Sequence, residues 1–132
     1  MAFKLGSEKR GIKFPKDVSF TNKKVTTNGN MGPGVVAQAN NDGSIEVDPN
    51  VDLNSEFGKR VMKHELKHTE QMEQGRADYG DNWVMWEGKI YMRKEEDGQP
   101  IIDGPNGRWP EGHPNHPWEA EAIAAEKINN NK

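Results

Sequence analysis

The strongest constraint on this chain is a stripe at helical spacing, between residues 54 and 75, that contains two histidines. Its members recur at steps of four and three residues: Phe57, Val61, His64, His68 and Gln71 or Met72. This spacing predicts an α-helix with one core-facing side. Asn54 or Ser55 can cap its start, and Gly75 can end it. Both histidines are therefore expected on the buried side of the helix.

Residues 64–68 read His-Glu-Leu-Lys-His, which is an HExxH motif. His64 and His68 lie one helical turn apart on one face, so both imidazoles can reach one metal ion. Glu65 lies beside them and can take a proton from a metal-bound water, whose pKa zinc lowers to roughly 7. The alternative interpretation is that both histidines are core residues bonded to backbone carbonyls. The helical, buried context favours the metal site.

A catalytic zinc site needs a third protein ligand, and the segment around residue 119 can provide it. A proline at position 117 suits the start of a short helix that ends near residue 128. Near the start of this helix, Glu119 is the favoured ligand, and Glu121 is the main alternative. His113 and His116 are further alternatives. A glutamate in a first helical turn also stabilises the helix without any metal, through the helix dipole.

An HExxH motif followed by a later helix with the signature Glu-Ala-Glu-Ala resembles the gluzincin-type zinc metallopeptidases, especially their small single-domain members. The resemblance covers about half of the chain, residues 35–75 and 117–128. It implies a zincin-like fold and hydrolysis of peptide bonds in a peptide or protein substrate. In that family, the hairpin before the motif helix supplies an edge strand that can hold the substrate.

The same resemblance implies a role for each residue of the site. His64, His68 and Glu119 would bind Zn²⁺, and Glu65 would be the general base. Many relatives carry Asp or Asn four residues after the ligand glutamate, where it orients a ligand histidine. This chain has Ile123 at that position. Residues 78 and 81, both aspartates, are the candidates to replace that orienting group.

A second resemblance, to small uncharacterised proteins of tailed bacteriophages, is carried by Gln71 and by the segment Asp-Tyr-Gly-Asp-Asn-Trp at residues 78–83. It indicates no activity. The chain is also short for a deep substrate cleft. The alternative function is therefore a catalytically inactive structural or interaction protein, including a phage-associated one, whose zinc stabilises the fold.

Two pairs of β-prone segments surround turn sequences, and they predict two hairpins. The first joins residues 35–39 to 44–47 through Asn-Asn-Asp-Gly, and the second joins 83–86 to 89–92 through Glu-Gly. Residues 103–117 are rich in Gly and Pro without a period and predict a loop. The fold class is therefore α+β, a minimal zincin-like fold with short β-hairpins, the HExxH helix and a second C-terminal helix.

The composition is polar, with 32% hydrophobic and 30% charged residues, so few side chains are available for a core. The core should therefore be aromatic, built from Trp83, Trp86, Trp109 and Trp118. The predicted organisation is a basic, mostly irregular N-terminal arm at 1–34, a zincin-like metal-binding domain at 35–128, and a frayed tail at 129–132.

The charge is divided unevenly between arm and body. Residues 1–24 contain seven Lys or Arg and two acidic residues, a net of +5, so the remainder carries −8 of the total of −3. The arm could bind nucleic acid, another protein such as a virion component, or the body of its own chain. The acidic body makes nucleic acid the weakest of these interpretations.

The chain has no cysteine, so His, Asp and Glu are the strong metal ligands that it can offer. It also shows no signal-peptide pattern and no apolar run of about 20 residues. The expectation is a cytoplasmic protein, in a host cell or a virion if phage-encoded, without membrane contact.

Overall fold

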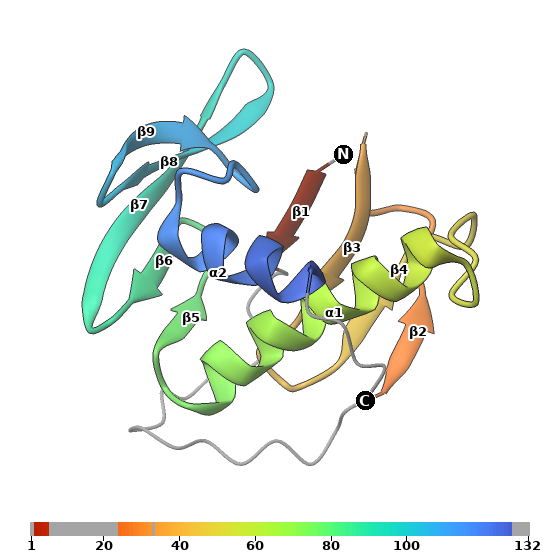
Figure 1. Cartoon of the computed structure of the whole chain (residues 1–132). Helices are drawn as coiled ribbons and strands as arrows, with labels where there is room; N and C mark the ends of the chain where they lie inside the picture. Colours follow the sequence, from red (N-terminus) through yellow and green to blue (C-terminus); the bar gives the residue numbers. More distant parts are fainter. Residues whose placement is uncertain (1, 6–23, 33, 128–132) are drawn as a thin grey trace.

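The computed structural model describes residues 2–5, 24–32 and 34–127, and places two helices between two β-sheets. The long helix α1 (Glu56–Glu73) runs through the middle of the molecule, and the short helix α2 (Pro117–Glu126) packs against it (Figure 1). This arrangement confirms the predicted α+β class, the motif helix and the second helix. No helix in the described part of the chain is long and apolar enough to span a bilayer.

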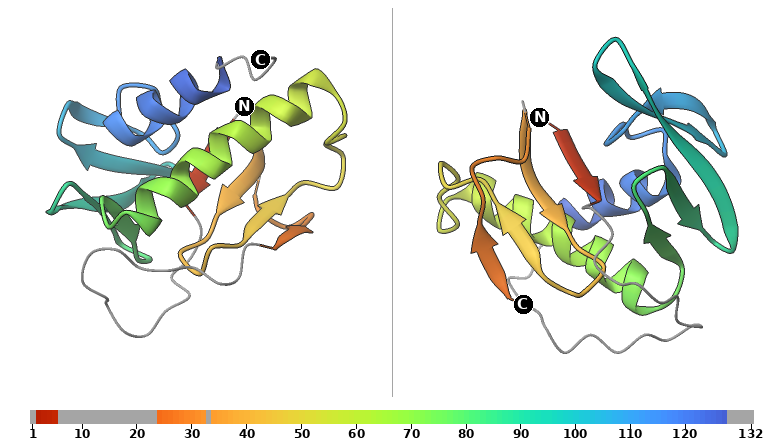
Figure 2. Two further views of the ribbon diagram at one scale, coloured as in Figure 1. Left: turned by 60° about the horizontal axis from the view of Figure 1, so that its bottom comes forward. Right: turned by 180° about the vertical axis from the view of Figure 1, so that it is seen from behind.

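The first sheet has four strands in the order β1-β3-β4-β2 and lies against α1 (Figure 2). Its strands are β1 (Ala2–Leu5), β2 (Val25–Thr27), β3 (Val35–Ala39) and β4 (Ile45–Val47). β3 and β4 form the predicted antiparallel hairpin, and β1 and β2 pair with them in parallel. Two short segments of the predicted arm are thus edge strands, whereas residues 6–23 of that arm lie outside the described residues.

Helix α1 begins and ends where its capping residues predict. The side chain of Ser55 accepts a hydrogen bond from the backbone N–H of Gly58 at 2.9 Å. Gly75 follows the helix with a φ of 76°, a conformation that glycine adopts without strain. The buried side of the helix packs on the four-stranded sheet through a cluster that includes Val61, Ile45 and Val47.

The second sheet has five antiparallel strands in sequence order. They are β5 (Ala77–Tyr79), β6 (Trp83–Trp86), β7 (Lys89–Glu96), β8 (Gln99–Gly104) and β9 (Gly107–Pro110). β6 and β7 form the second predicted hairpin. Glu87 and Gly88 turn the chain between them with φ values of 52° and 84°, as a tight two-residue turn requires.

The predicted loop at residues 103–117 is wrong in part, because β8 extends into it and β9 lies within it. These strands pair in a register that sets Gly104 opposite Gly107. Pro110 is tolerated because β9 is the edge of the sheet, where a missing N–H breaks no ladder. Short edge strands of this kind have too little apolar alternation to be recognised in a Gly/Pro-rich sequence.

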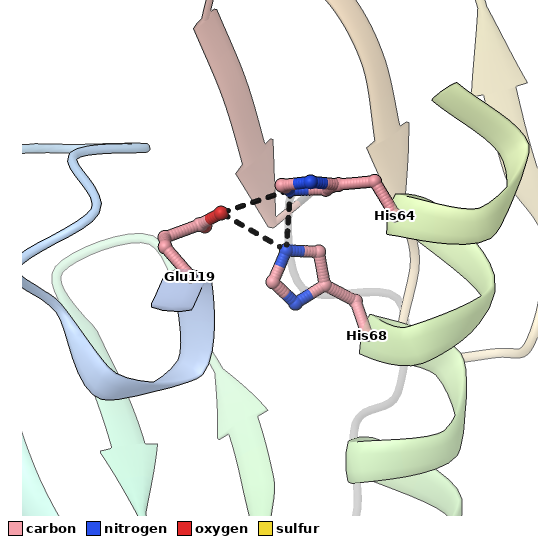
Figure 3. A group of neighbouring side chains, drawn as sticks. All are labelled: His64, His68 and Glu119. Atoms are coloured by element: carbon pink, nitrogen blue, oxygen red, sulfur yellow. Dashed lines mark hydrogen bonds and ion pairs between the residues drawn. The ribbon is translucent and has the colours of Figure 1, made fainter. Parts of the chain in front are cut away.

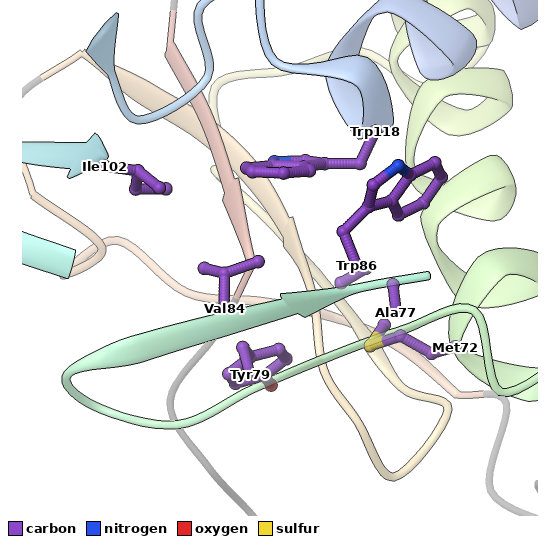
Figure 4. Packing of buried hydrophobic residues seen from close by; sticks show 8 residues of the cluster. Met72, Ala77, Tyr79, Val84, Trp86, Ile102 and Trp118 are labelled. Atoms are coloured by element: carbon purple, nitrogen blue, oxygen red, sulfur yellow. The ribbon is translucent and has the colours of Figure 1, made fainter. Parts of the chain in front are cut away.

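The second core lies between this sheet and the two helices (Figure 4). Its buried members are Ala39, Met72, Ala77, Tyr79, Val84, Trp86, Ile102 and Trp118. Two of the four tryptophans predicted for the core, Trp86 and Trp118, are buried there, with ring centroids 6.0 Å apart. Trp83 and Trp109 are only half-buried, and that part of the prediction is wrong.

Candidate metal centre

The predicted ligands come together where α2 crosses α1. His64 and His68 project from successive turns of α1, and Glu119 faces them from the first turn of α2 (Figure 3). Oε1 of Glu119 lies 2.9 Å from Nε2 of His64 and 3.2 Å from Nε2 of His68. The two Nε2 atoms are 3.2 Å apart. Among the described residues, this is the group of three that could hold a metal ion.

The three distances suit a tetrahedral ion. Zinc binds imidazole nitrogen and carboxylate oxygen at about 2.0–2.1 Å, which places neighbouring ligand atoms of a tetrahedron roughly 3.3 Å apart. The observed separations of 2.9, 3.2 and 3.2 Å approach that edge length. The three side chains can therefore surround one ion without a rotation of any of them.

The other nitrogen of each histidine is fixed by a partner. Nδ1 of His64 lies 2.7 Å from a carboxylate oxygen of Glu126, and Nδ1 of His68 lies 3.0 Å from the side-chain oxygen of Gln71. The Gln71 nitrogen donates elsewhere, which identifies its oxygen as the atom that faces His68. Both Nδ1 atoms therefore donate, so each neutral ring presents an unprotonated Nε2 to Glu119.

Three hydrogen-bond acceptors thus converge on one buried point, and a positive charge between them is needed to offset their mutual repulsion. A proton can supply that charge. Burial disfavours the charged form of His68, but the carboxylate of Glu119 outweighs it and raises the pKa of His68 to about 9. Burial alone would raise the pKa of Glu119, and the charge of His68 and the hydrogen bonds from both histidines lower it to about 2. A metal ion can also supply the charge, and to bind it must displace that proton.

Glu65 is buried beside the triad without a hydrogen bond. Its side chain is fully enclosed, and neither carboxylate oxygen has a partner among the described residues. Burial raises its pKa to about 7, against the opposing effect of His68 and His64. Oε2 of Glu119 is also buried without a partner. An unpaired buried carboxylate costs stability, so its presence beside the triad points to a role other than folding.

The alternative ligands have other partners. Glu121 accepts hydrogen bonds from Arg76 and Gln71. His113 stacks on Trp109, and its Nδ1 accepts a hydrogen bond from the backbone of Asn115. These contacts leave Glu119 as the glutamate of the second helix that faces the two motif histidines.

His116 is also outside the triad. It precedes α2 and stacks flat on Trp118, with ring centroids 4.8 Å apart, while Nε2 donates to the carbonyl of Trp109. Gly104 packs so closely against it that an added Cβ would lie 2.8 Å from Nδ1. His116 therefore supports the start of α2 and the segment β8–β9.

The groups that orient the histidines are not the expected aspartates. Oδ1 of Asp78 accepts hydrogen bonds from Asn41 and from its own neighbour's backbone N–H, and Asp81 is exposed. Glu126 and Gln71 hold the two Nδ1 atoms instead. Helical spacing could have found both, because Glu126 lies seven residues after Glu119, and Gln71 lies three after His68.

The arrangement can bind one cation, orient its ligands and hold a proton acceptor next to it. His64, His68, Glu65 and Glu119 are each at most 1% exposed. Searches against protein families, curated proteins and solved structures find no match for this chain.

Proposed function

We propose that this protein binds one zinc ion through His64, His68 and Glu119 and hydrolyses peptide bonds with Glu65 as the general base. The observation that carries the proposal is the convergence of three possible ligand atoms, from His64, His68 and Glu119, next to a buried carboxylate that has no partner among the described residues. A purely structural pair of core histidines would not need Glu119 opposite them. The order of hairpin, motif helix and glutamate-bearing helix also agrees with the gluzincin resemblance. The edge strand expected from that resemblance does not lie in this hairpin, because β1 and β2 pair with both of its outer edges.

Each group in the proposed site has its own role. When bound, zinc polarises the scissile carbonyl and lowers the pKa of a water molecule to roughly 7. Glu65 accepts the proton of the attacking water and passes it to the leaving nitrogen. Burial raises the pKa of this carboxyl, which strengthens it as a proton acceptor. Glu126 and Gln71 keep the ligand rings in place.

The test is Glu65→Gln, which keeps the shape of the side chain and removes its basicity. We expect the variant to bind zinc as the wild type does and to hydrolyse a peptide library about 10²–10⁴-fold more slowly. Glu70→Gln serves as the matched control, because it changes an exposed glutamate of the same helix that pairs with Lys67 and lies outside the triad. Equal hydrolysis by wild type and Glu65→Gln would disprove the catalytic role.

A second candidate function follows from the complete burial of the site. Every member of the triad is at most 1% exposed. In this alternative, zinc only stabilises the fold of a catalytically inactive interaction protein. In that case wild type and Glu65→Gln are equally inert on every peptide, and bound zinc exchanges slowly with added isotope. Fast exchange together with Glu65-dependent hydrolysis would reject the structural candidate.

A further inference from the structure

Gln71 connects the triad to an ion pair at the surface. Its side-chain oxygen accepts a hydrogen bond from Nδ1 of His68 at 3.0 Å. Its side-chain nitrogen donates to the carbonyl of Trp118 and to Oε1 of Glu121, at 3.1 Å each. The side chain is fully buried. One amide thus joins the motif helix to both the backbone and a side chain of α2.

Arg76 holds the outer end of this connection. Two nitrogens of its guanidinium donate to the two carboxylate oxygens of Glu121, at 3.1 and 2.5 Å. The same group donates to Glu87 at 2.8 Å and lies over the ring of Trp86, 4.7 Å from its centroid. Arg76 lies three residues after the end of α1, so a bidentate pair fixes the carboxylate of Glu121 near the end of the motif helix.

We propose that Gln71 is a positioning residue that keeps His68 in the tautomer that ligates through Nε2, and that Arg76 enforces this orientation through Glu121. The proposal rests on the metal site proposed above. A flipped amide would turn its nitrogen toward Nδ1 and favour the tautomer with the proton on Nε2, which cannot bind metal through Nε2. The flip would also turn the amide oxygen toward two other acceptors, the carbonyl of Trp118 and Oε1 of Glu121. Because Arg76 holds that carboxylate in place, the flip is disfavoured.

The two ligand histidines differ in this respect. The partner of His64 is the carboxylate of Glu126, which accepts hydrogen bonds through either oxygen and needs no such enforcement. The partner of His68 is an amide, which can face it with an acceptor or a donor. Only the His68 side therefore depends on a distant residue.

The experiment measures zinc affinity by competition with a chromophoric chelator for wild type, Gln71→Leu, Arg76→Met and the double variant. Loss of a group that orients a ligand typically costs 10–100-fold in metal affinity, which is the expectation for Gln71→Leu. Arg76→Met should lower the affinity roughly 2- to 30-fold through the network. In the Gln71→Leu background, Arg76→Met should have no further effect, because its route to His68 is already broken.

Arg108→Met is the matched control, since Arg108 forms a similarly exposed ion pair with Glu96 in the distant sheet. It should leave the zinc affinity unchanged. Equal losses from Arg76→Met in both backgrounds, or wild-type affinity in Gln71→Leu, would overturn the proposal. Thermal unfolding of each variant separates a loss of affinity from a loss of fold.

Long-range ¹⁵N–¹H spectra of His68 give a readout that does not need zinc. In metal-free protein well above the pKa of His68, the wild type should hold the proton on Nδ1, and Gln71→Leu should populate both tautomers. If the wild type binds no zinc, the proposed metal site is rejected, and these spectra still test the role of Gln71. If zinc binds without hydrolysis, the catalytic proposal is rejected, and the zinc affinities still test the positioning role of Gln71.

Discussion

The aromatic core and the metal triad are built by the same two helices, yet they are completed in different ways. Trp118 and Glu119 are neighbours at the start of α2, and they enter the aromatic cluster and the triad respectively. On α1, Met72 lies one turn beyond His68 and joins the aromatic cluster. Apolar side chains in the cluster need only contact with one another. The triad has three converging acceptors and an unpaired carboxylate, which contact alone does not satisfy.

This difference separates two contributions to stability. The aromatic cluster should stabilise the fold under all conditions, because burial of apolar surface needs no further group. The triad should stabilise the fold only when a proton or a metal ion lies between its acceptors, because the acceptors otherwise repel one another. Four predictions test this separation, in order of decreasing effect.

Trp118→Ala should give the largest loss. The side chain is 1% exposed and packs near Trp86, so its removal leaves a large cavity. We expect the free energy of unfolding to fall by about 3–5 kcal/mol, and this loss should be present without zinc as well as with it. Urea unfolding in the presence of zinc or of a chelator measures both values. A loss that appears only with zinc would contradict the separation.

Zinc binding should give the next largest effect. An ion that binds only the folded state at about 1,000 times its Kd raises the free energy of unfolding by about 4 kcal/mol. Thermal unfolding should show this increase in the wild type and none in His68→Ala. Glu119→Ala should weaken zinc binding far more than Glu121→Ala, because Glu121 only supports the orientation of Gln71. Equal losses would contradict the assignment of Glu119 as the third ligand.

Glu65→Gln should stabilise the metal-free protein. The folded-state pKa of Glu65 is raised to about 7, so its ionisation opposes folding. This cost is absent below the unfolded pKa near 4.5 and is complete above pH 7. We therefore expect a gain of about 1–3 kcal/mol at pH 8 and little change at pH 4. A variant that is less stable than the wild type at pH 8 would give Glu65 a structural role.

The apparent zinc affinity should depend on pH with a definite sign. The metal-free triad holds a proton on His68, whose pKa is raised to about 9 by Glu119 against the effect of burial. Zinc must displace this proton, so below pH 9 the affinity should fall about tenfold for each unit of decrease. Calorimetry in buffers of different ionisation enthalpy should count about one proton released. A pH-independent affinity would mean that the triad is unprotonated without metal.

Local patterns predicted the parts of this protein that depend on a few neighbouring residues. The caps of α1, the two hairpins and the shared face of His64 and His68 are confirmed, because turn chemistry and helical period act within one or two turns. The strands β8 and β9 were missed, because their residues carry no alternation and their pairing stabilises them. β1 and β2 were missed for the same reason, since both exist by pairing with the first hairpin.

By itself, the sequence determined the types of ligand and the placement of two of them, because the i and i+4 positions of a helix share a face in any fold. Only the tertiary structure decided which glutamate faces them and which residues hold their Nδ1 atoms. Glu119 and Glu126 lie 51 to 62 residues from the histidines that they contact. Such pairings depend on how α2 crosses α1, and the packing of the whole aromatic core sets that crossing.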